Sequence, residues 1–153
     1  MQLERAGVRL NAFAQDLFRD PQFTTAPSVH RVEVIGTTVG ELGLPDGGTY
    51  AQVLEQARLQ GLAVCPLELA PHLRLQWSSQ LESPNEGTAL KRGAPHGALT
   101  VASAAPPDEQ DVPWGFYLRR FDGNVWLRGY RSWSGHVRSS EDRIAFIRAT
   151  NAA

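Results

Sequence analysis

Few of the side chains that could do chemistry in this sequence have the neighbours that such chemistry needs. The single cysteine, Cys65, follows the end of an expected helix and precedes a proline, which suits a small buried residue better than a nucleophile. Ser132 and Ser134 stand close to His136, but the Gly-x-Ser-x-Gly pattern of serine hydrolases is absent. We therefore predict no catalytic residue. A small enzyme that combines Cys65 with the distant His72 or His136 stays an alternative.

The residue inventory also argues against common cofactor sites. The single lysine, Lys91, is followed by an arginine and lacks the glycine frame of a phosphate-binding loop. One cysteine and four histidines show no short spacing of the kind that holds structural zinc. The acidic run that begins at Asp108 lacks the glycine and the terminal glutamate of a calcium loop. We therefore predict neither a metal ion nor an organic cofactor.

The clearest chemical pattern is a run of arginines and aromatic residues near the C-terminus. Residues 114–138 contain five arginines and a single acidic residue, Asp122. Because side chains alternate between the two faces of a strand, six of the residues in the expected hairpin share one face. We call this set the Arg/aromatic face, and it comprises Tyr117, Arg119, Phe121, Trp126, Arg128 and Tyr130.

Two placements of the Arg/aromatic face are open. The aliphatic residues, with Phe116 and Leu118, most naturally face the core, which leaves the Arg/aromatic face outside. The opposite register would bury the aromatic rings, with the arginines covering the sheet edges. Arginine beside aromatic residues is typical of protein interfaces, and on a sheet the same combination grips single-stranded nucleic acid. We predict a non-catalytic protein-interaction or regulatory module that binds a protein partner or a second copy of itself, with nucleic acid as the alternative partner.

Length and composition favour one soluble domain. A chain of 153 residues, 42% of them hydrophobic, can bury a core without metal ions or disulfide bonds. Fifteen basic and sixteen acidic residues leave a formal charge of -1, so no overall field draws the chain to nucleic acid or membrane. No stretch resembles a signal peptide or a membrane span. We therefore expect a cytoplasmic protein without a membrane partner.

Two helices and a sheet are expected to position these residues. Apolar spacing predicts a helix from Val8 to Phe18, ended by Pro21. A second helix begins after Thr49, with Gln52 as its capping-box partner, and ends near Gly61. The Asp122-Gly123-Asn124 turn joins two strands of an antiparallel meander that closes the chain. Strands are expected at 32–35, 73–77, 98–102, 116–121, 125–130 and 143–148.

These elements predict an α+β fold in a single domain spanning residues 1–153. Two helices pack on a mainly antiparallel sheet of about five or six strands. Residues 78–111 contain several prolines and glycines and few large apolar side chains. We expect this Pro/Gly-rich region to form a long loop with the strand at 98–102 embedded in it.

The middle of the chain resembles a group of small bacterial proteins without known function. The resemblance lies in the run Thr38-Val-Gly-Glu-Leu-Gly-Leu-Pro-Asp-Gly-Gly-Thr, in Gly61-Leu-Ala-Val-Cys-Pro and in Arg74-Leu-Gln-Trp. Those proteins pair similar passages with a terminal hairpin that contains Trp-Leu. The resemblance covers about half of the chain. It implies a soluble, bacterial, single-domain protein and carries no catalytic assignment.

Overall fold

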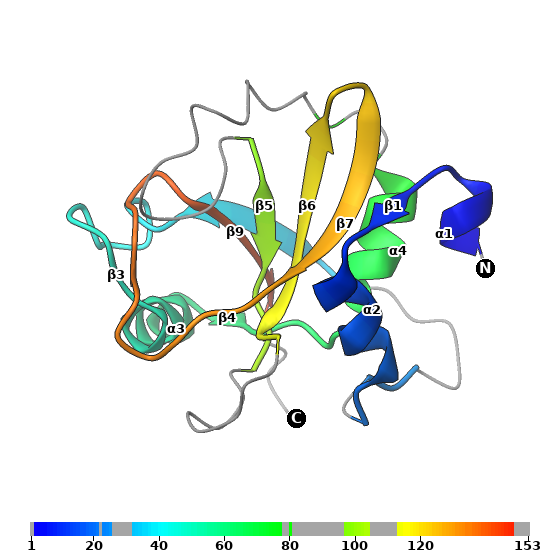
Figure 1. Ribbon diagram of the computed structural model, residues 1–153. Coiled ribbons are helices and arrows are strands. Elements are labelled where there is room, and N and C mark those ends of the chain that lie inside the picture. Colours follow the sequence, from blue (N-terminus) through cyan, green and yellow to red (C-terminus); the bar gives the residue numbers. More distant parts are fainter. Residues whose placement is uncertain are drawn as a thin grey trace.

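The computed structural model describes residues 2–21, 23–25, 32–77, 80, 97–104 and 113–148. Within these residues four helices accompany a seven-stranded mixed sheet and a separate two-stranded sheet (Figure 1). The helices are α1 (Gln2–Arg5), α2 (Ala12–Arg19), α3 (Tyr50–Leu59) and α4 (Leu69–Gln76). The strands are β1 (Arg9–Leu10), β2 (Val34–Thr38), β3 (Gly48–Thr49), β4 (Leu62–Ala63), β5 (Leu99–Val101), β6 (Gly115–Phe121), β7 (Asn124–Tyr130), β8 (Val137–Arg138) and β9 (Arg143–Arg148).

The large sheet has the order β1-β7-β6-β5-β9-β2, and β4 pairs with the end of β9. Two of its pairs, β1 with β7 and β5 with β9, are parallel. The α+β class is therefore observed, but the expectation of two helices on a mainly antiparallel sheet is wrong. The expected closing meander is also wrong, because β9 lies between β5 and β2 and not beside the hairpin. After the hairpin the chain forms β8, which pairs with β3 in the small sheet.

The terminal hairpin and the helix after Thr49 form as the sequence predicts. Asp122 and Gly123 have φ values of 52° and 75°, as the tight turn between β6 and β7 requires. At the start of α3 the Thr49 hydroxyl accepts the Gln52 amide, and the Gln52 side chain accepts the Thr49 amide. Gly61, just past the helix, has a φ of +78°.

Residues 73–77 belong largely to helix α4, so the strand expected there is wrong. Pro71 occupies the first turn of α4, where a backbone N–H has no partner within the helix, so the proline is tolerated. The apparent alternation misleads because Arg74, expected on a polar face, is buried at 2% exposure. Its guanidinium donates to the side chain of Gln80 at 2.6 Å and to the carbonyl groups of Trp126 and Trp77.

Helix α2 corresponds to the helix expected from Val8 to Phe18, but it begins later, because the side chain of Asn11 caps it. Asn11 Oδ1 accepts the amide of Ala14 at 2.9 Å, and α2 starts at Ala12. Residues 9 and 10 instead form β1. Strands β2, β5 and β9 fall close to the ranges expected for them. The parts of the expected loop at 78–79, 81–96 and 105–111 lie outside the described residues.

Two hydrophobic clusters lie on opposite faces of the large sheet. On one face α1, α2 and α4 cover the hairpin, where Phe116, Leu118 and Leu127 are fully buried. On the other face α3 packs near β2, β4 and β9, around Val53 and Phe146. Figure 1 shows α1, α2 and α4 gathered on one side of β6 and β7, with α3 on the other side of the molecule. Among the described residues, no helix has both the length and the apolar character that crossing a bilayer requires.

Candidate binding face

The register of the sheet places the Arg/aromatic face on the same side as α3. Thr100 pairs with Tyr117 on one side and with Ile144 on the other, so these three side chains share a face. Ile144 belongs to the cluster that α3 covers. Helix α3 packs over the β9 end of this face and contacts β3 and β4. The hairpin strands β6 and β7 carry the rest of the same face.

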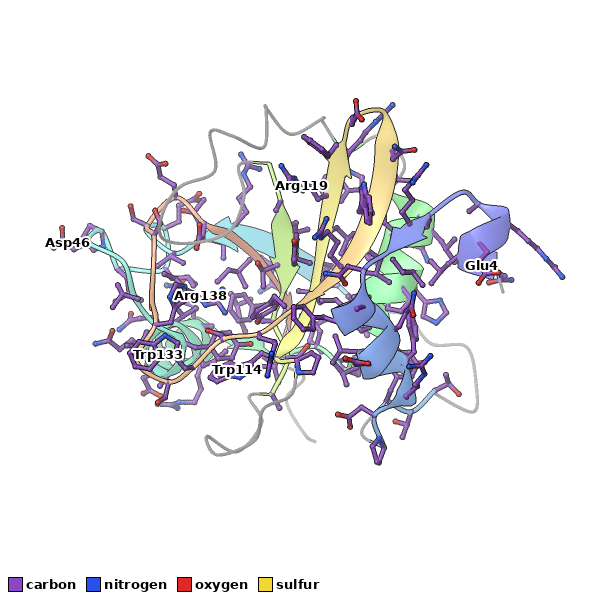
Figure 2. All side chains as sticks on the ribbon, in the orientation of Figure 1. Glu4, Asp46, Trp114, Arg119, Trp133 and Arg138 are labelled. Carbon is purple, nitrogen blue, oxygen red and sulfur yellow. The ribbon has the colours of Figure 1, made fainter. Side chains whose placement is uncertain are left out.

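All six residues predicted for the Arg/aromatic face lie on β6 and β7 with their side chains on this common face. Tyr117 is opposite Arg128, and Arg119 is opposite Trp126. Five of the six are half-buried. Arg119, which we expected on the outer side, is buried at 2% exposure. Figure 2 labels Arg119 near β5 and β6.

Guanidinium groups lie over the aromatic rings of this face. Arg128 is 4.9 Å from the ring centroid of Trp126 and 5.9 Å from that of Tyr117. Arg119 lies 4.5 Å from the ring centroid of Phe121. A guanidinium held over an aromatic ring gains electrostatic attraction to the ring and loses freedom to rotate. The arginines are therefore held in place by their own neighbours.

The same pattern continues beyond the hairpin in both directions. Arg9 of β1 lies 6.0 Å from the Trp126 ring, at one end. At the other end, the rings of Tyr117 and Tyr130 are 6.4 Å apart, and Arg138 of β8 lies 5.2 Å from the Tyr130 ring. We call this continuous series the stack, and its members are Arg9, Trp126, Arg128, Tyr117, Tyr130, Arg138 and Tyr50.

Tyr50, the first residue of α3, anchors the far end of the stack. Its ring lies 4.9 Å from the Arg138 guanidinium and 5.7 Å from the Trp114 ring. Its hydroxyl donates to the Ser103 carbonyl and accepts the Ser103 amide. Burial, more than any other cause, raises the pKa of Tyr50 far above its usual value, so the hydroxyl stays protonated. Figure 2 labels Arg138 on the side of the molecule where α3 lies.

Several polar atoms of the stack lack hydrogen-bond partners. Trp126 Nε1, Arg128 Nε and Arg138 Nε are buried atoms without an acceptor in the part of the chain that the structure describes. Arg138 does donate from Nη2 to the Tyr130 hydroxyl at 3.2 Å. All three unpartnered atoms are donors, and none is an acceptor. Within the described ranges no carboxylate forms an ion pair with Arg128 or Arg138.

Among the described residues, no hydrogen bond joins Cys65 to His72 or His136. The Cys65 thiol is buried and donates to the Ala145 carbonyl at 3.7 Å. Burial raises the pKa of Cys65 to about 12, so the thiolate needed for attack does not form near neutral pH. His72 lies 3.9 Å from Glu68 on α4, while burial and the nearby Arg138 lower the pKa of His136. Cys65 therefore lacks the environment of a nucleophile.

Among the described residues, no group of three or more His, Cys, Asp and Glu side chains is arranged to hold a metal ion. No family model, curated protein or solved structure matches this chain. The resemblance of the central passage to small bacterial proteins therefore stays a prediction.

Sequence reasoning identified the hairpin part of the stack and missed its ends. Arg9 and Tyr50 come from elements more than 60 residues earlier in the chain, so no local pattern links them to Trp126 or Arg138. Arg138 was visible only as one of five arginines in a basic run. Trp133 belongs to that same run but lies outside the stack, at 65% exposure. Figure 2 labels it near α3.

Proposed function

We propose that this protein is a non-catalytic interaction module that binds a protein partner through the Arg/aromatic face. One observation carries the proposal: a continuous stack of arginines and aromatic rings that begins on the half-buried face of the hairpin strands and runs to Tyr50 at the start of α3. Tryptophan, tyrosine and arginine contribute most of the binding energy at protein interfaces. Because stacking already holds these side chains, binding costs little additional conformational entropy.

The exposure of the face fits such a role. Trp126, Arg128 and Tyr130 are half-buried, so each offers an edge to a partner while its body is packed. The opposite face of the hairpin is covered around Phe116 and Leu118, on which α2 and α4 pack. In the described part of the chain, the Arg/aromatic face is the half-exposed surface of the hairpin strands.

A protein partner fits this face better than nucleic acid does. Proteins that grip single strands offer open aromatic ring faces on which bases stack. Here the guanidinium of Arg128 lies over Trp126, and that of Arg119 lies over Phe121. These ring faces are therefore occupied by the protein's own arginines. The formal charge of -1 also provides no overall attraction for phosphate chains.

The test is affinity purification of the tagged protein from its own cell extract, with and without nuclease. We expect one stoichiometric protein in both samples. Trp126→Ala and Arg128→Ala should each reduce its recovery at least about tenfold, the effect of losing about 1.4 kcal/mol of binding free energy. The matched controls are Trp133→Ala, which removes an exposed tryptophan outside the stack, and Arg19→Ala on α2.

Circular dichroism of each variant shows whether its fold is intact. Unchanged recovery with folded Trp126→Ala and Arg128→Ala proteins would contradict the proposal. Material that disappears after nuclease treatment would instead favour nucleic acid as the partner. Equal losses in the control variants would move the contact surface away from the Arg/aromatic face.

A further inference from the structure

We infer that the partner presents carboxylates to the stack, so that the protein recognises an acidic segment of another protein. This inference rests on the proposed function and adds the chemistry of the ligand. It is carried by the half-buried Arg128 and by the donors on Trp126, Arg128 and Arg138 that have no acceptor among the described residues and lie along one series of stacked side chains.

The unpartnered atoms require an acceptor. Buried polar atoms in folded proteins almost always have a hydrogen-bond partner, and exceptions point to a missing one. Trp126 Nε1, Arg128 Nε and Arg138 Nε can only donate. An ionised carboxylate only accepts, and its two oxygens can receive two parallel N–H groups from one guanidinium. These three N–H groups are buried, so a carboxylate can approach only where a side chain that carries one is itself partly at the surface, as that of Arg128 is.

Arg138 strengthens the case because it carries a charge in a buried position. It is 4% exposed, and it donates a hydrogen bond to the neutral Tyr130 hydroxyl. A buried charge is stable only when it is paired or well hydrogen-bonded. Two tyrosine rings, of Tyr50 and Tyr130, lie on its guanidinium at 4.9 and 5.2 Å, and in the described structure it has no ion pair. Arg138 therefore adds an uncompensated positive charge to the stack, which favours negative charge at the surface beside Arg128.

Arg128 is the arginine of the stack that such a carboxylate can reach from the surface. It is half-buried, so a partner can reach part of this side chain without displacing it from the stack. It lies between the rings of Trp126 and Tyr117, which fix the plane of the guanidinium. From Arg128 the stack leads through Tyr117 and Tyr130 to Arg138. An acidic segment lying along the hairpin can contact Arg128, whereas Arg138 stays buried and acts on the segment only through its charge.

The test uses nuclear magnetic resonance of the full-length, nitrogen-15-labelled protein. Indole Nε1–H and arginine Nε–H groups give separate signals, so the proposed donors are observed directly. The probes are a short peptide that alternates glutamate with leucine, the same peptide with glutamine in place of glutamate, and single-stranded oligothymidylate. We expect the glutamate peptide alone to shift the Trp126 and Arg128 signals, with the Trp133 indole signal unmoved.

Substitutions identify the groups that bind. Arg128→Ala should weaken glutamate-peptide binding at least about tenfold, whereas Arg19→Ala should leave it unchanged. Trp126→Phe keeps an aromatic ring and removes only the indole donor, so it should weaken binding by a smaller factor in a protein that still folds. Arg128→Lys keeps the charge but loses the planar fork, and should bind less tightly than the natural protein.

The outcomes separate this inference from the proposed function. Equal shifts with the glutamine and glutamate peptides would overturn carboxylate recognition while leaving a protein-binding face in place. So would the absence of any shift, if a cellular partner still depended on Trp126 and Arg128. Shifts with oligothymidylate alone would overturn both the inference and the proposal of a protein partner.

Discussion

At the scale of single residues, Gly129 shows how closely α2 approaches the hairpin. A Cβ added at this position would lie 2.6 Å from the carbonyl carbon of Phe13 and 2.7 Å from the amide nitrogen of Ala14. Both are backbone atoms at the start of α2, and they cannot move aside as a flexible side chain would. A glycine is therefore required where the helix crosses β7.

We predict that Gly129→Ala lowers the free energy of unfolding by about 2 kcal/mol or more, as overpacking a tight contact does. Gly36 of β2 is the matched control, because it is also a strand glycine and a Cβ there would meet nothing within 4 Å. Gly36→Ala should change stability by less than about 1 kcal/mol. Urea denaturation measures both values. Equal effects at the two positions would contradict the close approach of α2.

Cys65 predicts a specific loss of stability in alkali. Its thiol ionises near 9.0 in the unfolded chain, and burial raises the pKa to about 12 in the folded protein. Below pH 9 both states hold the proton, so the ionisation of this thiol makes no difference to stability. Between the two values only the unfolded state releases it, so the free energy of unfolding falls as pH rises, by up to about 1.4 kcal/mol per pH unit.

Comparison with Cys65→Ala isolates this effect from other alkaline titrations. The natural protein should lose its stability advantage over the variant as pH rises above 9, whereas the difference should be constant near neutrality. Urea denaturation at a series of pH values gives the measurement. A difference that does not vary with pH would show that the thiol ionises equally in both states.

At the scale of elements, Asn11 joins a helix cap to a sheet edge. Its Oδ1 accepts the amides of Ala14 and of Gly129, at 2.9 and 2.8 Å. Its Nδ2 donates to the Gly129 carbonyl at 3.0 Å. The side chain therefore occupies the edge of β7 as a neighbouring strand would, just past the two residues of β1.

We predict that Asn11→Ala costs about 2 kcal/mol of stability, since it removes a helix cap and both bonds to the strand edge. Thr49→Ala removes only the cap of α3 and should cost about 1 kcal/mol. Asn11→Asp should fall between the natural protein and Asn11→Ala, because it keeps the acceptor and loses the donor. Urea denaturation ranks the three variants. A larger loss for Thr49→Ala would contradict the double role of Asn11.

Elements fixed by nearby residues could be predicted from the sequence, and those fixed by distant contacts could not. The Thr49–Gln52 cap and the Asp122-Gly123 turn are made by residues within three positions of each other. Helix α4 was mistaken for a strand because the burial of Arg74 depends on the Trp126 carbonyl, 52 residues away. Likewise, the pattern of β9 marks it as a strand but does not choose β5 and β2 as its neighbours.

The candidate site, too, could be predicted from the sequence only where nearby residues determine it. Alternation along β6 and β7 was enough to group Tyr117, Arg128 and the rest of the Arg/aromatic face. It was not enough to show that Arg119 is buried, because alternation gives the face of a residue and not how the rest of the chain packs on that face. Nor could it show that Tyr50 completes the stack, since Tyr50 reaches Arg138 only after α3 has packed on the sheet.

At the scale of the whole molecule, one sheet connects the two hydrophobic clusters. Strand β5 contributes Val101 to one cluster and the next residue, Ala102, belongs to the other. Neither cluster can lose its strands without disturbing the other. We therefore expect the described parts of the chain to unfold in a single cooperative transition.

The prediction is that tryptophan fluorescence and far-ultraviolet circular dichroism give coincident urea transitions. Leu17→Ala, in the first cluster, should lower the midpoint of this transition, since emptying a fully buried leucine site costs about 2–5 kcal/mol. Val53→Ala, in the second cluster, should lower the same midpoint. Two separate transitions, each sensitive to only one substitution, would show that the clusters unfold independently.

The parallel pairing of β1 with β7 has a consequence for how the chain folds as it is made. Residues 9 and 10 find their strand partners at residues 126 and 127, so the first segment leaves the ribosome long before its partner exists. Until the hairpin has been synthesised, the apolar side chains of α2, including Leu17, are exposed to water or bound by a chaperone. Such distant pairing also slows refolding, because a large loop must close before its contacts form. Nascent chains halted before β7 should therefore be more sensitive to protease than the complete protein.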